Sequence, residues 1–187
     1  MRRPVALEHA SRLVNHGPTV LVSTAHEGRR NVMAAAWSMP VEFVPPRIAV
    51  VIDKRTFTHE LLMASGRFAL SLPTPPLADL SYRVGNESGR EVDKFERHAI
   101  ASFDGLVHGL PLIEGCCAWL ELERLPEPGC EQRYDTVFGE VVSAQADDRV
   151  FAQGRWQIGG HNADLHTLHH YGGGLFGVPT RTVAASR

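Results

Sequence analysis

Residues 31–58 read NVMAAAWSMPVEFVPPRIAVVIDKRTFT, and the interpretation of the whole chain starts from this stretch. It predicts a strand of small residues, an apolar strand over 48–52, and a helix that begins after the basic pair 54–55. Thr56 or Thr58 is suited to cap this helix, whose first amides have no partner inside the helix and attract an anion. The small side chains let a flat ligand approach the backbone. We therefore expect this stretch to hold a ring with a phosphate tail.

Length and charge limit what the protein can be. The chain has 187 residues, with 19 basic and 21 acidic residues and a formal net charge of −2. This length suffices for one core without disulfides or metal ions, so we expect a single domain over 1–187, with a lead-in helix over 1–16 and an irregular tail over 155–187. The mixed charges give no basic face for nucleic acid or membrane. No apolar run has the length of a signal peptide or a membrane span, so we expect a cytoplasmic protein that binds small molecules.

Hydrophobic periodicity predicts a mainly β protein. Strands are expected over 19–25, 31–37, 48–52, 68–72, 113–125 and 133–144, and helices over 57–64 and 77–84. Segment 96–111 is expected to be irregular, and 126–129 is expected to be a hairpin-like connection. Because helices separate few of these strands, the pattern favours a small β-barrel over a doubly wound sheet.

Several motifs together resemble the flavin reductase-like family of FMN-binding split barrels. They are N-x-x-A-A-A-W-S-x-P-V from Asn31, the proline doublet 45–46, Thr56-x-Thr58, R-F-A-L-S-L-P from Arg67, and S-G-R-x-x-D-K-F from Ser88. The resemblance spans roughly residues 16–178. It implies a mainly β fold, namely a Greek-key split β-barrel with a few flanking helices.

The resemblance also implies FMN as the cofactor and suggests which residues contact it. The cofactor-binding candidates are Asn31, Ala35, Ala36, Trp37, Ser38, Met39, Lys54, Arg55, Thr56, Thr58, Ser88, Gly89, Arg90, Lys94, Phe95 and Phe176. Lys94 is expected to reach the flavin or its phosphate and to stabilise the anionic reduced ring. The segment 88–90 is expected to line the mouth where a nicotinamide stacks, and Phe176 to cover the ring. Taken alone, Trp37 also fits a core position.

The sequence identifies no catalytic side chain and predicts no metal site. Cys116, Cys117 and Cys130 lack C-x-x-C spacing, and nothing marks any of them as a nucleophile. Two of them are adjacent in an expected strand, so their thiols should face opposite sides. The histidines between 161 and 170 fit no standard zinc pattern.

Three functions are considered for this sequence. The first is an NAD(P)H-dependent flavin reductase that passes a hydride from the nicotinamide to flavin N5, with the chemistry supplied by the cofactor. No strand is followed by G-x-G-x-x-G, so the nicotinamide would lie directly over the flavin. The alternative is an FMN-binding electron carrier or flavin-holding module without a nicotinamide reaction. A third is a structural or regulatory subunit without flavin.

The resemblance further implies a homodimer, in which the second subunit completes the pocket. A flavin-dependent monooxygenase or another acceptor protein is the expected electron partner. No recognisable motif distinguishes NADH from NADPH as the reductant. None shows whether FMN is a prosthetic group or a substrate.

Overall fold

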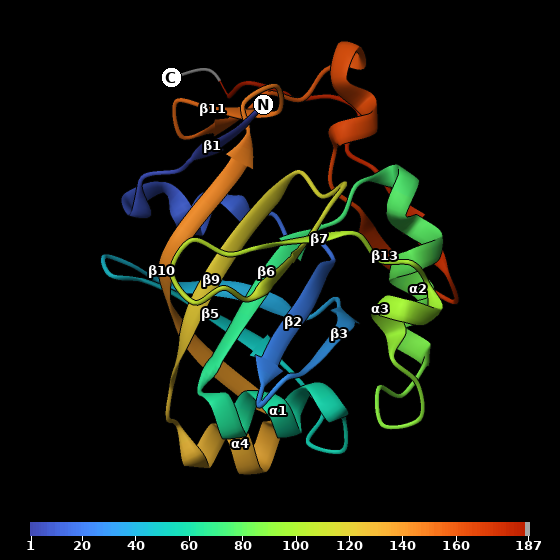
Figure 1. The fold of residues 1–187 in the computed structure, drawn as a ribbon. Helices are drawn as coiled ribbons and strands as arrows, with labels where there is room; N and C mark the ends of the chain where they lie inside the picture. The colour runs from blue at the N-terminus through green and yellow to red at the C-terminus, as the bar shows by residue number, and fades with distance from the viewer. Residues whose placement is uncertain (186–187) are drawn as a thin grey trace.

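Eight strands form one antiparallel sheet in the computed structural model, which describes residues 1–185 (Figure 1). Seven follow the order β3-β2-β6-β9-β10-β5-β4, and β1 pairs with the end of β10. The bounds are β1 Arg2–Pro4, β2 Val20–His26, β3 Arg29–Ala35, β4 Ser38–Phe43, β5 Pro46–Val51, β6 Arg67–Leu72, β9 Ala118–Leu125 and β10 Thr136–Asp147. The sheet curls, so that β5 passes behind β9 and β10 in Figure 1. The expected mainly β, antiparallel architecture is confirmed.

Helices cover one end and one side of the sheet. α1 (Phe57–Ser65) and α4 (Pro128–Tyr134) lie at the lower end in Figure 1, and α2 (Ala78–Asn86) and α3 (Lys94–Arg97) lie beside β3. Three short 3-10 helices complete the set: η1 Leu7–Leu13, η2 Pro75–Leu77 and η3 Gly160–Leu165. No helix within residues 1–185 has both the length and the apolarity to cross a membrane.

Both faces of the central strands are buried, so the structure has two hydrophobic clusters. Val20 and Val22 of β2 face the larger cluster inside the curled sheet. Leu21, between them, faces the second cluster with Val84 of α2 and Phe95 of α3. This is the two-residue alternation of a strand. The second cluster fastens α2 and α3 against the sheet and thereby fixes the position of the groove described below.

The two adjacent cysteines lie just before β9, because residues 114–117 of the expected strand 113–125 do not form a strand. Cys117 belongs to the inner cluster and Cys116 to the outer one, so their thiols face opposite sides as predicted. Both are buried, and burial raises the pKa of both thiols, that of Cys117 to about 12. Cys130, in α4, is half-buried. All three cysteines are free thiols.

The structure places a further strand in the connection between the expected strands 31–37 and 48–52. Residues 38–43 form the edge strand β4, which pairs with β5 and has an irregularity between Pro40 and Glu42. A proline lacks the ladder donor, but it is tolerated on an edge strand or at a bulge. The turn is thereby reduced to the residues between Phe43 and Pro46.

The expected hairpin-like connection over 126–129 does join two antiparallel neighbours, β9 and β10, but it is longer than predicted because it contains helix α4. Pro128 stands in the first turn, where its missing amide costs nothing. Arg124 at the end of β9 holds the helix through two hydrogen bonds to the carboxylate of Glu131, at 2.8 and 2.7 Å. The last expected strand therefore begins at Thr136, three residues later than predicted.

Three further segments are more regular than expected. In segment 96–111 and just beyond it, β7 (Ser102–Asp104) pairs with β8 (Pro111–Ile113). The lead-in helix over 1–16 is a 3-10 helix preceded by β1. The tail over 155–187, whose last two residues lie outside the described part, contains β12 (Arg155–Trp156), paired with β11 (Phe151–Ala152), and the hairpin β13 (His169–Gly172) and β14 (Leu175–Gly177). Short paired strands of this kind give too few alternating residues for a periodicity signal.

Candidate functional site

Two adjoining hollows lie between the edge strand β3 and helix α2. The larger is about 530 Å³ and is lined by Thr19, Met33, Ala34, Ala35, Ala36, Trp37, Val51, Asp53, Ser81, Tyr82, Gly85, Asn86, His170, Gly173 and Phe176. The smaller is about 380 Å³ and is lined by Asn31, Met33, Asp53, Arg55, Thr56, Phe57, Thr58, Val84, Gly85, Asn86, Glu87, Ser88, Gly89 and Lys94. Four residues line both, so the two form one groove. We call them the ring hollow and the phosphate hollow, after the ligand parts that each one suits.

The ring hollow is flat-sided and largely apolar. The small side chains of residues 34–36 on and after β3 form one wall, and Tyr82 of α2 belongs to the other. His170 and Phe176, on the hairpin β13–β14, line it as well, with their ring centroids 5.3 Å apart. Trp37 borders the same hollow with 73% of its surface exposed. Several aromatic groups around alanines suit a planar, conjugated ligand.

The phosphate hollow contains the start of α1. Thr56 caps this helix, since its hydroxyl accepts a hydrogen bond from the amide of His59. The amides of Phe57 and Thr58, in the first turn, have no carbonyl four residues back within the helix. Asn31 Nδ2 donates to Thr58 Oγ1 at 2.8 Å, which fixes β3 against the helix start. Free first-turn amides and the positive end of the helix dipole form a site for an anion.

Charged groups in the groove are mostly paired within the protein. Arg55 binds the carboxylate of Asp53 through Nε and Nη2, and this contact lowers the pKa of Asp53 to about 2. The Arg55 guanidinium is therefore largely neutralised, and 86% of its side chain is exposed. The helix start therefore contributes positive potential for a ligand phosphate.

Lys94 lines the phosphate hollow, but its ammonium makes contacts other than those expected. Nζ donates to the carbonyl oxygens of Val32 at 2.9 Å and Val84 at 2.7 Å, so it joins β3 to the last turns of α2. The residue is only 3% exposed, and desolvation lowers its pKa to about 8, against the opposing effect of Glu87. Lys94 therefore fixes the two walls of the groove.

Five other candidates lie outside both hollows. Lys54 points to α4, where Nζ donates to the Gln132 carbonyl at 3.0 Å, since an exposed cation is favourable at a helix C-terminus. Phe95 is 2% exposed in the outer cluster because its benzyl group fills the gap between α3 and the sheet. Ser38, Met39 and Arg90 line neither hollow.

The candidates at the two ends of the groove come together as the motifs suggested. Ala35, Ala36, Trp37 and Phe176 line the ring hollow. Asn31, Arg55, Thr56, Thr58, Ser88, Gly89 and Lys94 line the phosphate hollow. Ser88 and Gly89 had been expected at the nicotinamide mouth, whereas they border the start of α1, because the loop after α2 returns toward that helix.

Sequence reasoning missed the contribution of α2 and of the tail histidine. Ser81, Tyr82, Gly85 and Asn86 line the groove, and the spacing i, i+1, i+4, i+5 places them on one face of α2. That spacing was a usable signal. His170 belongs to a hairpin that periodicity could not reveal, so no pattern in the sequence marked it.

Of the other tail histidines, His169 contacts the protein body, since its ring centroid lies 5.3 Å from that of His16, whereas His166 makes its hydrogen bonds within the tail. His16 Nε2 lies 2.9 Å from Thr167 Oγ1, and Thr167 Oγ1 lies 3.1 Å from His169 Nε2. Desolvation lowers the pKa of His16 to about 4. His166 shares a hydrogen bond with Asn162. Within residues 1–185, no three His, Cys, Asp or Glu side chains are grouped to hold a metal ion.

Comparison with known proteins agrees with this geometry. The model of the flavin reductase like domain family matches residues 12–177. The uncharacterized protein YddH of Escherichia coli K12 is 51% identical over 185 residues, which cover 97% of each chain. An FMN-binding domain of a flavin reductases-like enzyme from Shewanella baltica has a TM-score of 0.95 and 39% identity, covering 100% of this chain and 98% of the other.

A more distant solved structure has the same fold. The FMN-binding protein from Thermus thermophilus, with bound 1-cyclohex-2-enone, has a TM-score of 0.76 and 32% identity, over 91% of this chain and 90% of that one. The curled antiparallel sheet is therefore the split barrel that the motifs implied. The chain belongs to the flavin reductase-like family.

Proposed function

We propose that this protein binds FMN in the groove and is an NAD(P)H-dependent flavin reductase. The observation that carries the proposal is the continuity of a flat, aromatic-bordered hollow with an anion-binding helix start. The isoalloxazine ring would lie against residues 34–36, and the phosphate would bind the first-turn amides of α1. The descriptions of the Shewanella and Thermus relatives, which name FMN binding, support the assignment.

The protein's part in the reaction is to position and cover the ligand. FMN, when bound, supplies the redox chemistry. The alanine wall and the rings of Tyr82 and Phe176 would hold the flat ligand, while the exposed Trp37 leaves an approach from outside. A nicotinamide that enters there needs no separate dinucleotide fold, because it stacks on the same groove.

FMN should stabilise the fold more than riboflavin does. At free FMN of about 100 times Kd, the free energy of unfolding rises by about 2.7 kcal/mol, and Tm rises by about 5–10 °C for a chain of this size. Riboflavin lacks the phosphate that the start of α1 would bind, so its shift should be smaller. Thermal melts with each flavin at the same concentration, together with quenching of tryptophan emission, measure this difference. Equal shifts would refute the phosphate assignment, and no shift with either would refute flavin binding.

Anaerobic reduction tests the reductase assignment. NADH or NADPH, mixed with FMN-loaded protein, is expected to bleach the visible flavin absorbance within seconds, because hydride transfer needs only stacking in the groove. Dithionite serves as the control for a reducible flavin. A flavin that dithionite reduces and both nicotinamides leave oxidised would support the electron carrier or flavin-holding module instead.

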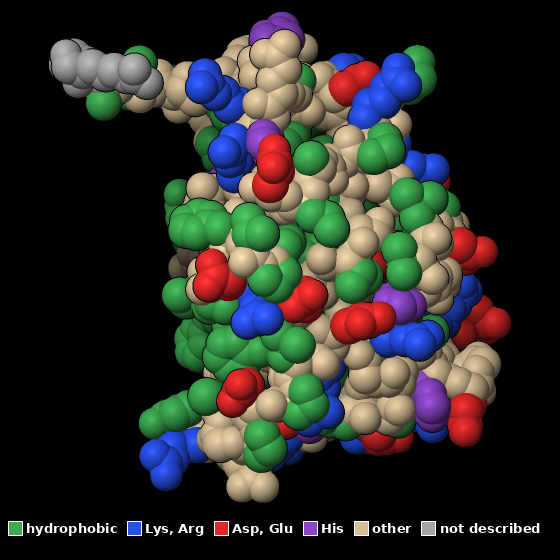
Figure 2. Space-filling model, turned by 90° about the vertical axis from the view of Figure 1, so that its left-hand side faces the viewer, with side chains coloured by type: hydrophobic (Ala, Val, Ile, Leu, Met, Phe, Trp, Pro, Cys, Tyr) green, Lys and Arg blue, Asp and Glu red, His purple; other side chains and the backbone are tan. Residues whose placement is uncertain are grey.

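We also propose a homodimer formed through β4. The side chains of Trp37, Met39, Val41, Phe43 and Val44 are 73, 59, 42, 72 and 75% exposed. They follow one edge strand, and Figure 2 shows hydrophobic side chains gathered on this side of the molecule. An exposed apolar surface of this kind is typical of a protein interface. Because Trp37 also borders the ring hollow, a second copy on β4 would add a wall beside the groove and narrow the approach at Trp37 without closing it. An acceptor protein such as a monooxygenase would then approach the opening that remains.

A charge in the middle of this surface should separate the copies. Phe43→Glu is expected to give a particle of 20.6 kDa by light scattering, where the parent chain gives twice that mass. Desolvating a carboxylate in an apolar interface is the physical cause. The matched control is Tyr134→Glu, another exposed aromatic, at 61%, on α4, which should leave the mass unchanged. A parent chain that is monomeric with FMN bound would contradict the dimer.

A further inference from the structure

The tail of the chain forms a loop whose two ends meet. We call residues 166–179, which contain the hairpin β13–β14, the tail loop. The residues of this loop that line the ring hollow are His170, Gly173 and Phe176. At the base of the loop, His166 Nδ1 lies 2.5 Å from the carbonyl oxygen of Pro179. The contact between the two ends therefore helps to fix three of the residues around the hollow.

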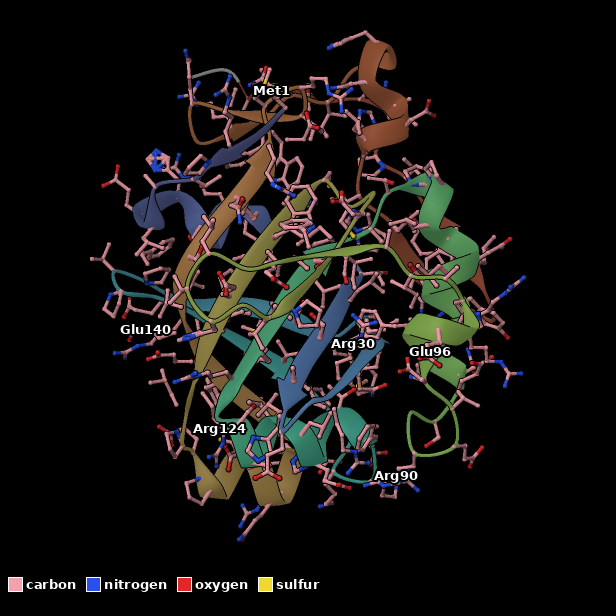
Figure 3. All side chains as sticks on the ribbon, viewed as in Figure 1. Met1, Arg30, Arg90, Glu96, Arg124 and Glu140 are labelled. Atoms are coloured by element: carbon pink, nitrogen blue, oxygen red, sulfur yellow. The ribbon has the colours of Figure 1, made fainter. Side chains whose placement is uncertain are left out.

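The base of the tail loop lies near the start of α2. His166 is the C-terminal cap of η3, and η3 packs against η2, which leads directly into α2. In Figure 3, η3 lies at the upper end of the molecule, the end at which Met1 is labelled, whereas Arg124 is labelled at the lower end. His166 is thus close to one wall of the groove, although it lines neither hollow.

Both ring nitrogens of His166 face oxygen atoms that can only accept hydrogen bonds. Nδ1 faces the Pro179 carbonyl, and Nε2 lies 2.8 Å from Asn162 Oδ1. Each of these contacts requires an N–H on the ring. A neutral imidazole has one N–H, whereas the imidazolium has two. Because His166 is only 1% exposed, water cannot replace a missing partner. The imidazolium is therefore the form that satisfies both contacts.

The orientation of the Asn162 amide follows from its own hydrogen bonds. Nδ2 donates to the carbonyl oxygens of Arg149 at 2.8 Å and of Gln157 at 2.5 Å. A reversed amide would place Oδ1 against both of these oxygens, so Oδ1 must face His166. The Gly159 amide also approaches His166 Nε2, but at 3.4 Å, and it donates to Asn162 Oδ1 at 3.2 Å. It therefore does not require a bare nitrogen on His166.

The charge on His166 has no ion-pair partner. Within residues 1–185, the histidines with a carboxylate at 4 Å or less are His9, His26, His98 and His108. The charged and titratable side chains on the segments around His166 are Asp147, Arg149, Arg155, His161, Asp164, His169, His170 and Arg181, with His16 beyond Thr167. Asp147 and Arg149 pair with each other, and desolvation lowers the pKa of His16 and His169. The proton on His166 therefore depends on the two carbonyl-type oxygens.

We propose that a proton on His166 closes the tail loop, so that flavin binding in the ring hollow weakens as this proton is lost with rising pH. His166 is then a positioning residue, which acts through the hairpin β13–β14. The inference rests on the proposed function, because it takes the flavin ring to lie in the ring hollow.

Loss of the proton breaks one of the two hydrogen bonds of His166. The deprotonated nitrogen then presents a lone pair to an oxygen 2.5 or 2.8 Å away, and the two acceptors repel each other. The closed loop therefore binds one proton more than an open loop in which water solvates the ring. Closure is favoured at the lower pH and lost as the pH rises. Histidine is the side chain that changes charge between pH 5 and 8, so pH 6 and pH 8 are the conditions to compare.

Nitrogen NMR of the histidine rings tests the protonation of His166 without any flavin. In an imidazolium both nitrogens carry a proton and resonate close together, whereas in a neutral ring they are well separated. The ¹⁵N-histidine-labelled parent chain at pH 6 should show an imidazolium that is missing from His166→Gln. His166→Asn gives the same assignment if His166→Gln does not fold. A His166 ring with only one protonated nitrogen at pH 6 would overturn the proposal.

The Kd for FMN, measured for the parent chain and His166→Gln at both pH values, tests the coupling to the groove. One glutamine amide cannot donate to both oxygens, so the ratio of Kd in the variant to Kd in the parent should be about 3- to 30-fold at pH 6. At pH 8 the ratio should be within about twofold of one, because the parent has then lost its proton. Titration of the FMN phosphate, Lys94 and His170 is common to both chains and cancels in the ratio.

His161→Gln is the matched control, because His161 is an exposed histidine on the same η3. Its Kd ratio to the parent should stay near one at both pH values. A ratio for His166→Gln that is the same at pH 6 and pH 8 would overturn the proposal. If the parent chain binds no FMN, the proposed function fails and the coupling fails with it, whereas the nitrogen spectrum still shows whether His166 holds its proton.

Discussion

Gly89→Ala is expected to lower the FMN affinity by at least about tenfold and the free energy of unfolding by about 1–3 kcal/mol, the usual cost of overpacking. A Cβ at this position would lie 2.2 Å from Asn31 Oδ1, 2.6 Å from Asn31 Cγ and 2.8 Å from Phe57 Cδ1. Either the loop after α2 or Asn31 must move. Moving Asn31 breaks its hydrogen bond to Thr58, which fixes β3 against the start of α1.

Isothermal titration with FMN and urea denaturation measure the two effects. Gly129→Ala in α4 is the matched control, because a Cβ there meets nothing within 4 Å. In a helix this control should be neutral or stabilising by about 0.5–1 kcal/mol. Parent-like FMN affinity in Gly89→Ala would show that the phosphate hollow does not hold the ligand.

Lys94→Met is expected to lower the free energy of unfolding by about 2–5 kcal/mol, since it leaves two buried carbonyls, those of Val32 and Val84, without their donor. For a chain of this size, Tm should fall by about 5–15 °C. FMN affinity should fall as well, because β3 and α2 are the two walls of the groove. Lys54→Met is the control, since the Lys54 side chain is 56% exposed. If Lys94→Met were as stable as the parent chain, the hydrogen bonds of Lys94 to the two carbonyls would not stabilise the fold.

The difference in the free energy of unfolding between the parent chain and Lys94→Met depends on pH with a definite sign. The pKa of Lys94 is lowered from 10.5 to about 8 in the folded protein. Between these two values the unfolded chain binds more protons, so the contribution of Lys94 to stability rises with pH in that range and is constant below it. Comparing urea denaturation of the parent and Lys94→Met at pH 7 and pH 10 isolates the effect. A direct contact with flavin would instead shift the reduction potential of bound FMN in Lys94→Met without lowering stability.

The barrel strands were predictable because they are short runs rich in β-branched and other apolar residues. β2, β5 and β6 carry such patterns, and α1 has both a cap at Thr56 and a C-terminal Gly66 with positive φ. The phosphate hollow was also predictable, because a capped helix start after a strand is a common binding site for an anion.

The parts of the fold and of the site that the sequence did not predict depend on contacts between segments that are distant in the chain. Lys94 is a cation in the sequence, and only the approach of Val32 and Val84 reveals that its ammonium is buried. The hairpin β13–β14 turns through Gly172, Gly173 and Gly174, all with positive φ, and its side chains bind the body and the groove. A pattern of single residues carries no information on such pairings.

The arrangement of the three thiols makes the protein suited to site-specific labelling. Cys116 and Cys117 are enclosed by the two hydrophobic clusters, and their raised pKa values keep them protonated and unreactive at neutral pH. A maleimide dye added to the folded chain is therefore directed to Cys130 on α4, at the end of the barrel away from the ring hollow. An emitter there would report flavin binding by energy transfer, with no cysteine removed and no residue of the groove altered.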